Sequence, residues 1–88
     1  MDQTITFHER IHKKHPDISV DDVQDAWKSR VKCQLRRGEW PPQYVALGFD
    51  RKGRALQMVA VYEPLTDGVL VFHAMRVTGN VKKELGYE

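Results

Sequence analysis

The sequence contains a single cysteine, Cys33, among 88 residues, which excludes an intramolecular disulfide framework and favours a reducing compartment. It has no apolar run near the ~20 residues that a membrane-spanning helix requires. Its first residues also lack the basic segment and apolar stretch of a signal peptide. These absences predict a cytoplasmic protein that does not insert into a membrane.

Common enzyme signatures are missing as well. The sequence has no G-x-S-x-G motif, no P-loop and no dinucleotide-binding glycine fingerprint, and Cys33 has no C-x-x-C partner. We therefore expect no resident cofactor. The length predicts one domain over residues 1–88, and 41% apolar with 30% charged residues is typical of a folded chain rather than a disordered one.

Helical patterns occur first along the chain. Phe7 and Ile11 are four residues apart, which predicts a helix over Thr6–Lys14 that ends before Pro16. Ser19 is a suitable N-cap for a second helix, which acidic residues follow in the first turn. The apolar side of this second helix is predicted to contain Val20, Val23, Ala26, Trp27 and Val31.

From about residue 31 the apolar period changes to two, which predicts a strand with Cys33 packed on the core side and basic residues outward. Further strands are expected at Tyr44–Phe49, Ala55–Tyr62 and Val69–Met75, followed by a short helix at Thr78–Leu85. The short loops favour antiparallel pairing. The predicted fold is α+β: two N-terminal helices packed on a four-stranded antiparallel sheet, with a short C-terminal helix.

The last two predicted strands are apolar on both sides, so we expect them at the centre of the sheet. The chain supplies few helices to cover both faces. One face is therefore expected to be partly open, and an open, partly apolar sheet face is a candidate surface for a binding partner.

Positive charge is concentrated just after the second helix, in a segment without acidic residues. This pattern indicates either a solvated face or a surface that binds the phosphates of RNA. Trp40 follows in the Gly38–Pro42 turn, where an exposed indole would suit base stacking or a protein partner. The basic residues of the segment are Lys28, Arg30, Lys32, Arg36 and Arg37.

One motif suggests a different chemistry. His8, Glu9 and His12 form an H-E-x-x-H pattern, which in zinc peptidases places two metal-binding histidines one helical turn apart. A zinc-dependent hydrolase is therefore one hypothesis. Adventitious metal binding and ordinary surface positions are the alternatives, and a chain of this size has little room for a peptidase cleft.

His73 is the histidine of most interest, although a structural role is its default interpretation. RNA cleavage requires a group that removes the proton of the 2′-hydroxyl, a group that protonates the leaving 5′-oxygen, and cations for the phosphorane charge. We predict that His73 and Arg76, with His15 and Arg36, line one surface that performs this reaction without a metal. His73 and Arg76 can converge only if the strand ends or bulges between them.

Three segments together resemble a known family. They are Lys14-His15, the hairpin Gln43–Arg54 with its Tyr-Val-Ala-Leu-Gly run, and the strand end Val71–Thr78. Their order and spacing are similar to those of the BrnT-like toxins of type II toxin–antitoxin systems, a branch of the RelE-like ribonuclease fold. The resemblance extends from about Thr6 to Tyr87. The family's Ser-Ala-Arg is replaced here by His73-Ala74-Met75, and the C-terminal helix is shorter.

The resemblance implies a ribonuclease toxin that blocks translation. It also implies a cognate antitoxin with a ribbon-helix-helix DNA-binding module, with which the toxin would form a hetero-oligomer. By position, Lys14 and His15 match the pair at the end of the family's first helix, Arg76 falls in the end of its last strand, and Tyr87 lies near its C-terminal tyrosine. Lys14 and Tyr87 are thus expected to contact RNA. A non-catalytic protein-binding module of the same fold is the alternative.

Overall fold

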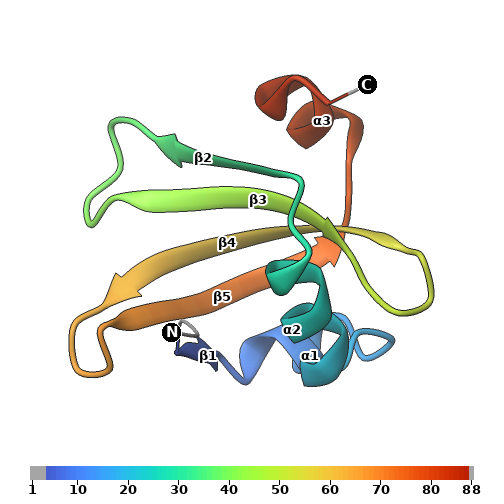
Figure 1. Ribbon diagram of the computed structural model, residues 1–88, viewed down its shortest axis with the longest axis horizontal. Helices are drawn as coiled ribbons and strands as arrows, with labels where there is room; N and C mark the ends of the chain where they lie inside the picture. Colours follow the sequence, from blue (N-terminus) through green and yellow to red (C-terminus); the bar gives the residue numbers. More distant parts are fainter. Residues whose placement is uncertain (1–3, 88) are drawn as a thin grey trace.

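The computed structural model describes residues 4–87, which form three helices and one five-stranded sheet (Figure 1). The sheet order is β1-β5-β4-β3-β2, in which β1 runs parallel to β5 and all other neighbours are antiparallel. The elements in chain order are β1 (Ile5–Phe7), α1 (Arg10–Lys14), α2 (Val20–Lys28), β2 (Lys32–Arg36), β3 (Gln43–Phe49), β4 (Ala55–Glu63), β5 (Gly68–Arg76) and α3 (Gly79–Leu85).

The prediction of a four-stranded antiparallel sheet is wrong, because residues 5–7 form a strand rather than the start of a helix. The amide of Val69 donates to the carbonyl of Thr4, and the amide of His8 donates to the carbonyl of Val71. These bonds satisfy backbone groups that the edge of β5 would otherwise leave unpaired. The helix prediction rested on one pair of apolar residues, Phe7 and Ile11, at i, i+4 spacing. A single pair of this kind also fits a strand that is followed by a helix.

Two of the predicted helices, α2 and α3, are confirmed, and contacts at their ends explain where they begin and end. Ser19 accepts a hydrogen bond from the amide of Asp22, while the Asp22 side chain accepts from the amide of Ser19, so α2 begins with a complete capping box. The Thr78 hydroxyl caps α3 by accepting from the amide of Val81, and Gly86 ends α3 with a φ of 67°, which glycine adopts without steric cost.

The two faces of the sheet are covered by different helices, and α1 and α2 lie apart from α3 (Figure 1). On the first face Ala46, Met58 and Ala74 pack with the buried side chains of α1 and α2. On the second face Val45 and Leu47 pack with residues of α3. We call these the α2 face and the α3 face. As expected, β4 and β5 each have a neighbour on both sides.

Helix α2 lies over β3 and β4 but does not extend over β2. Cys33 is therefore exposed, and the prediction of a packed thiol is wrong. Val20 and Val31 are each 52% exposed, and Val31 lies beyond the helix, so neither belongs to the buried side of α2. Val23, Ala26 and Trp27 are buried as predicted. In residues 4–87 no helix is long and apolar enough to cross a membrane.

Candidate functional site

A bulge in β5 determines which way His73 faces. Ala60 pairs with Val71 and the preceding residue of β4, Val59, pairs with His73, so Phe72 is an extra residue in β5. Directly paired residues share a face. Val71 accordingly lies on the α2 face, whereas His73 lies on the α3 face. Simple alternation would place both on one face, and the bulge separates them.

His73 meets a second histidine at the margin of the α3 face. The ring of His15, which ends α1, stands edge-on to the ring of His73 with 6.3 Å between the ring centroids. Both side chains are half-buried. Of the four residues predicted to form a catalytic site, the structure brings these two into direct contact.

His15 and His73 are together called the histidine pair, and positive side chains act on His73. Burial lowers the pKa of His73 below its ordinary 6.5, and positive charge at His15, Lys14, Arg10 and Arg36 lowers that pKa further. A neutral imidazole of this kind can accept a proton at neutral pH. Two elements supply these charges: α1 with its C-cap, and β2.

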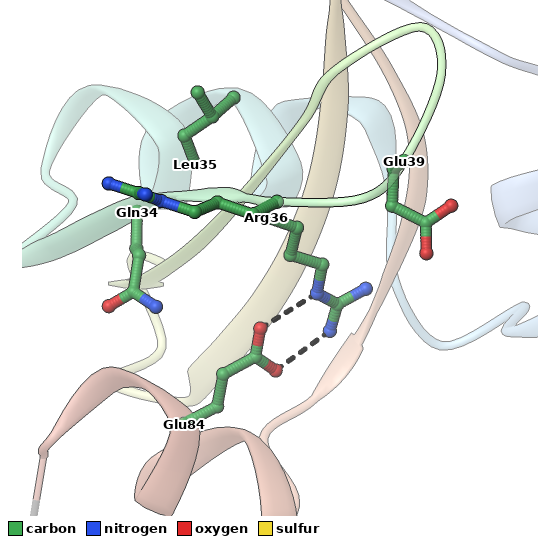
Figure 2. A pocket seen from close by; sticks show the side chains of 6 residues that line it. Gln34, Leu35, Arg36, Glu39 and Glu84 are labelled. Carbon is green, nitrogen blue, oxygen red and sulfur yellow. Dashed lines mark hydrogen bonds and ion pairs between the residues drawn. The ribbon is translucent and has the colours of Figure 1, made fainter.

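Arg36 is held in place by a residue of α3. Its Nε donates to Glu84 Oε2 at 2.8 Å and its Nη2 donates to Glu84 Oε1 at 2.9 Å, and Figure 2 shows this two-pronged contact. The hydrogen bonds from Arg36 lower the pKa of Glu84. Both side chains remain about one-third exposed, at 31% and 30%. A phosphate oxygen could therefore approach the guanidinium from the solvent side.

Arg76 does not join this group. It pairs with Leu56, whose side chain lies in the core of the α2 face, and its Nη2 lies 3.7 Å from Asp17 Oδ2. The bulge occurs before His73 rather than between His73 and Arg76. The expectation that these two residues line one surface is therefore wrong, because the strand between them is regular and their separation is odd.

The predicted RNA-binding residues are dispersed over the molecule. Lys14 is exposed beside the histidine pair, and Lys32 lies on the same face as Arg36 because its partner is Leu47. Arg30 instead stacks on Trp27, with 4.6 Å from its Cζ to the ring centroid.

The remaining members of that set lie away from the histidine pair. Lys28 is exposed at the end of α2, and Arg37 is exposed just after β2. Trp40 is 88% exposed in the β2–β3 turn, as its loop position predicted. Tyr87 is half-buried against Phe49, with 6.5 Å between the ring centroids, so it anchors α3 rather than facing the site.

Sequence reasoning missed Arg10, whose positive charge acts on His73. A signal was present, because Arg10 and Lys14 are four residues apart on α1 and so lie on one side of it. The predicted helix Thr6–Lys14 already contained this spacing, but Arg10 was not connected with the site.

The H-E-x-x-H residues do not share a helix. His8 precedes α1 and Glu9 is its N-cap, so the two histidines lack the one-turn helical spacing on which the zinc motif depends. His8 Nδ1 accepts from the amide of Arg10, and His12 Nδ1 lies 3.3 Å from the carbonyl of Ile18. Among residues 4–87 no group of three histidine, cysteine or acidic side chains is placed to hold a metal ion.

No protein-family profile, curated protein or solved structure matches this chain.

Proposed function

We propose that the chain is a metal-independent endoribonuclease whose catalytic residues are His73 and His15. The observation that carries the proposal is the contact between these two half-buried imidazoles within a group of arginine and lysine side chains. Their ring centroids are 6.3 Å apart. That separation allows both rings to reach oxygen atoms of one phosphodiester through charge-assisted hydrogen bonds of about 2.8 Å.

The two histidines take complementary roles in the proposed reaction. Neutral His73 removes the proton of the 2′-hydroxyl, and the 2′-oxygen forms a bond to the adjacent phosphorus. Protonated His15 donates its proton to the 5′-oxygen as the bond between phosphorus and that oxygen breaks. The products are a 2′,3′-cyclic phosphate and a 5′-hydroxyl, so atoms and protons balance.

The cations supply the electrostatic part of catalysis. Arg10 and Lys14 come from α1, which ends at His15, whereas Arg36 comes from β2, three strands along the sheet from β5, and its charge acts on His73 from a greater distance. The pentavalent phosphorane carries more negative charge at its oxygens than the substrate does. Positive groups positioned at this site before the reaction therefore favour the transition state over the ground state.

We also propose a cytoplasmic toxin of a type II toxin–antitoxin system, with an antitoxin that carries a ribbon-helix-helix module. The resemblance of three sequence segments to BrnT-like toxins supports this more specific assignment. Expression without a partner is then expected to arrest growth and to leave new cleavage sites in total RNA. Unimpaired growth at high levels of folded protein would contradict the toxin assignment without affecting the biochemical one.

The biochemical test uses a fluorescently labelled oligoribonucleotide and purified protein in the presence of excess EDTA. Cleavage is expected to persist with the chelator and to yield 2′,3′-cyclic phosphate ends. A 2′-deoxy nucleotide at the cleaved position should abolish cleavage there, because the nucleophile is absent. Burial and the neighbouring charges lower the pKa of His73, so the limb of the rate profile that rises with pH should lie below pH 6.5.

Matched histidine variants identify the site. His73→Asn and His15→Asn should each reduce the cleavage rate by about 10²-fold or more, as positioned acid–base groups typically contribute. His8→Asn is the control, because His8 is exposed and lies outside the histidine pair. All variants should retain the wild-type circular dichroism spectrum. Equal cleavage by His73→Asn and His8→Asn would return His73 to a structural role.

A further inference from the structure

The edge of β2 is open along the strand. In residues 4–87 β2 has a single neighbour, β3, so alternate residues of β2 direct their amide and carbonyl groups away from the sheet. The opposite edge of the sheet is the much shorter β1, which spans Ile5–Phe7. The segment from Lys32 to Arg36 contains no proline that would interrupt a ladder of hydrogen bonds.

An open hollow of about 660 Å³ lies along this edge (Figure 2). Four consecutive residues line it, from Gln34 to Arg37, together with Glu39 and Glu84. Successive residues of a strand point to opposite faces, so a hollow that touches Gln34, Leu35 and Arg36 reaches along the edge of β2, and Glu84 of α3 extends it onto the α3 face. Its position at an unpaired strand edge suits an extended chain placed next to β2.

The side chains of β2 indicate which residue types an added strand would carry on each face. On the α2 face Val31 is 52% and Leu35 is 45% exposed, and Cys33 is exposed between them. On the α3 face lies Lys32, and Arg37 follows the strand. Within the described residues neither of these two cations has an ion-pair partner. Side chains of an added strand lie beside those of β2 on the same face, where apolar and opposite-charge pairs stabilise the pairing.

We propose that β2 accepts an extended segment of a partner protein in which apolar and acidic residues alternate. The apolar side chains pack beside Val31 and Leu35, and the acidic ones lie on the α3 face, where Lys32 is the cation without an ion-pair partner among the described residues. This binding does not depend on the proposed ribonuclease activity. It uses main-chain hydrogen bonds for affinity and side-chain alternation for specificity.

Two other occupants fit less well. A second copy of the chain that paired through β2 around Gln34 would place Lys32 opposite Arg36 of the second copy, and like charges directly opposite are destabilising. A nucleic acid offers phosphate to the cations but no row of amides and carbonyls to the strand edge. The exposed backbone and apolar side chains of β2 therefore favour a protein strand.

Three nine-residue peptides test the proposal. The first peptide alternates valine and glutamate, and the second alternates valine and lysine. The third has the same composition as the first, with its valines in one block and its glutamates in another. Fluorescence anisotropy should show binding of the first peptide and at least tenfold weaker binding of the other two. The second peptide places cations beside Lys32, and the third cannot place all its apolar residues on one face. Equal binding of all three, or no binding of the first at millimolar concentration, would overturn the proposal.

Two further measurements test whether the peptide binds at β2: the amide signals of the protein and a charge reversal at Lys32. In nuclear magnetic resonance spectra the first peptide should shift the amides of residues 31–37 and slow their exchange with solvent. Lys32→Glu should weaken binding by up to about fivefold, the contribution of one cross-strand ion pair. Lys13→Glu, an exposed change of equal charge on α1, should leave binding unaltered. Shifts confined to other elements, or displacement of the peptide by an oligonucleotide with no change at residues 31–37, would also refute it.

Discussion

Gly48 is expected to be the least replaceable glycine of the fold, because α2 crosses β3 directly above it. A Cβ atom at this position would lie 1.8 Å from the carbonyl oxygen of Ala26 and 2.7 Å from the carbonyl carbon. Real Cβ contacts are essentially never shorter than 3.0 Å. Both close atoms belong to the helix backbone, so no side chain can rotate away and α2 itself must move by more than 1 Å.

The loss of stability expected from Gly48→Ala follows from the packing contacts that a movement of α2 would break. Helix α2 carries the buried Val23 and Trp27, and lifting it opens their packing against the sheet. Overpacking a core costs about 1–3 kcal/mol and sometimes more, and a clash with backbone belongs at the upper end. Removing a glycine from a strand returns only about 0.5–1 kcal/mol. We expect a net loss of about 2–3 kcal/mol, which corresponds to a decrease in Tm of roughly 10–20 °C.

Thermal unfolding followed by circular dichroism measures this loss, with Gly79→Ala as the matched control. Gly79 is the first residue of α3, and no heavy atom lies within 4 Å of a Cβ built there. Its replacement should leave Tm unchanged or raise it slightly, because alanine favours a helix. If Gly48→Ala and Gly79→Ala unfolded within ~1 °C of each other, the close approach of α2 to β3 would be refuted.

Three further outcomes are expected. Gly68→Ala would place a Cβ 2.0 Å from the carbonyl oxygen of Thr4, so amide exchange of residues 5–7 should accelerate more than that of the rest of the sheet. Burial alone would raise the pKa of Asp50, but hydrogen bonds from Arg54 and Lys52 lower it below 3.8. The stabilisation from this carboxylate is complete above pH ~4 and is lost as the pH falls through the folded-state pKa, so the urea midpoint should decline there and Asp50→Asn should flatten the decline. Trp40→Ala should change the free energy of unfolding by less than about 0.5 kcal/mol, because the indole is 88% exposed; a loss above ~1.5 kcal/mol would contradict its placement.

Local signals in the sequence were sufficient for most elements. Ser19 and Thr78 precede helices as caps, and Gly86 ends the last helix, because these residues act on backbone groups within a few positions of themselves. The alternation of apolar residues likewise located β2, and apolar runs between turns located β3 to β5. Burial of Trp27 and exposure of Trp40 also followed from their positions in a helix and a turn.

The candidate site was only partly predictable. His73 and His15 were both named from the sequence, and the structure places their rings in contact. Arg10 was not named, because nothing in the sequence showed that the first helix ends beside β5. Arg76 was named, but its side chain lies on the α2 face next to Leu56, where it approaches Asp17.

By itself the sequence determined the helices and strands after residue 9, since caps, turns and apolar periods are properties of neighbouring residues. Only the tertiary structure decided that residues 5–7 pair with β5, because that pairing depends on backbone groups more than 60 positions away along the chain. It also decided the face of His73, since the extra residue Phe72 is defined only by the strand that pairs with it. A strand's period indicates which residues share a face until a bulge reverses it, and a bulge is a property of two strands together.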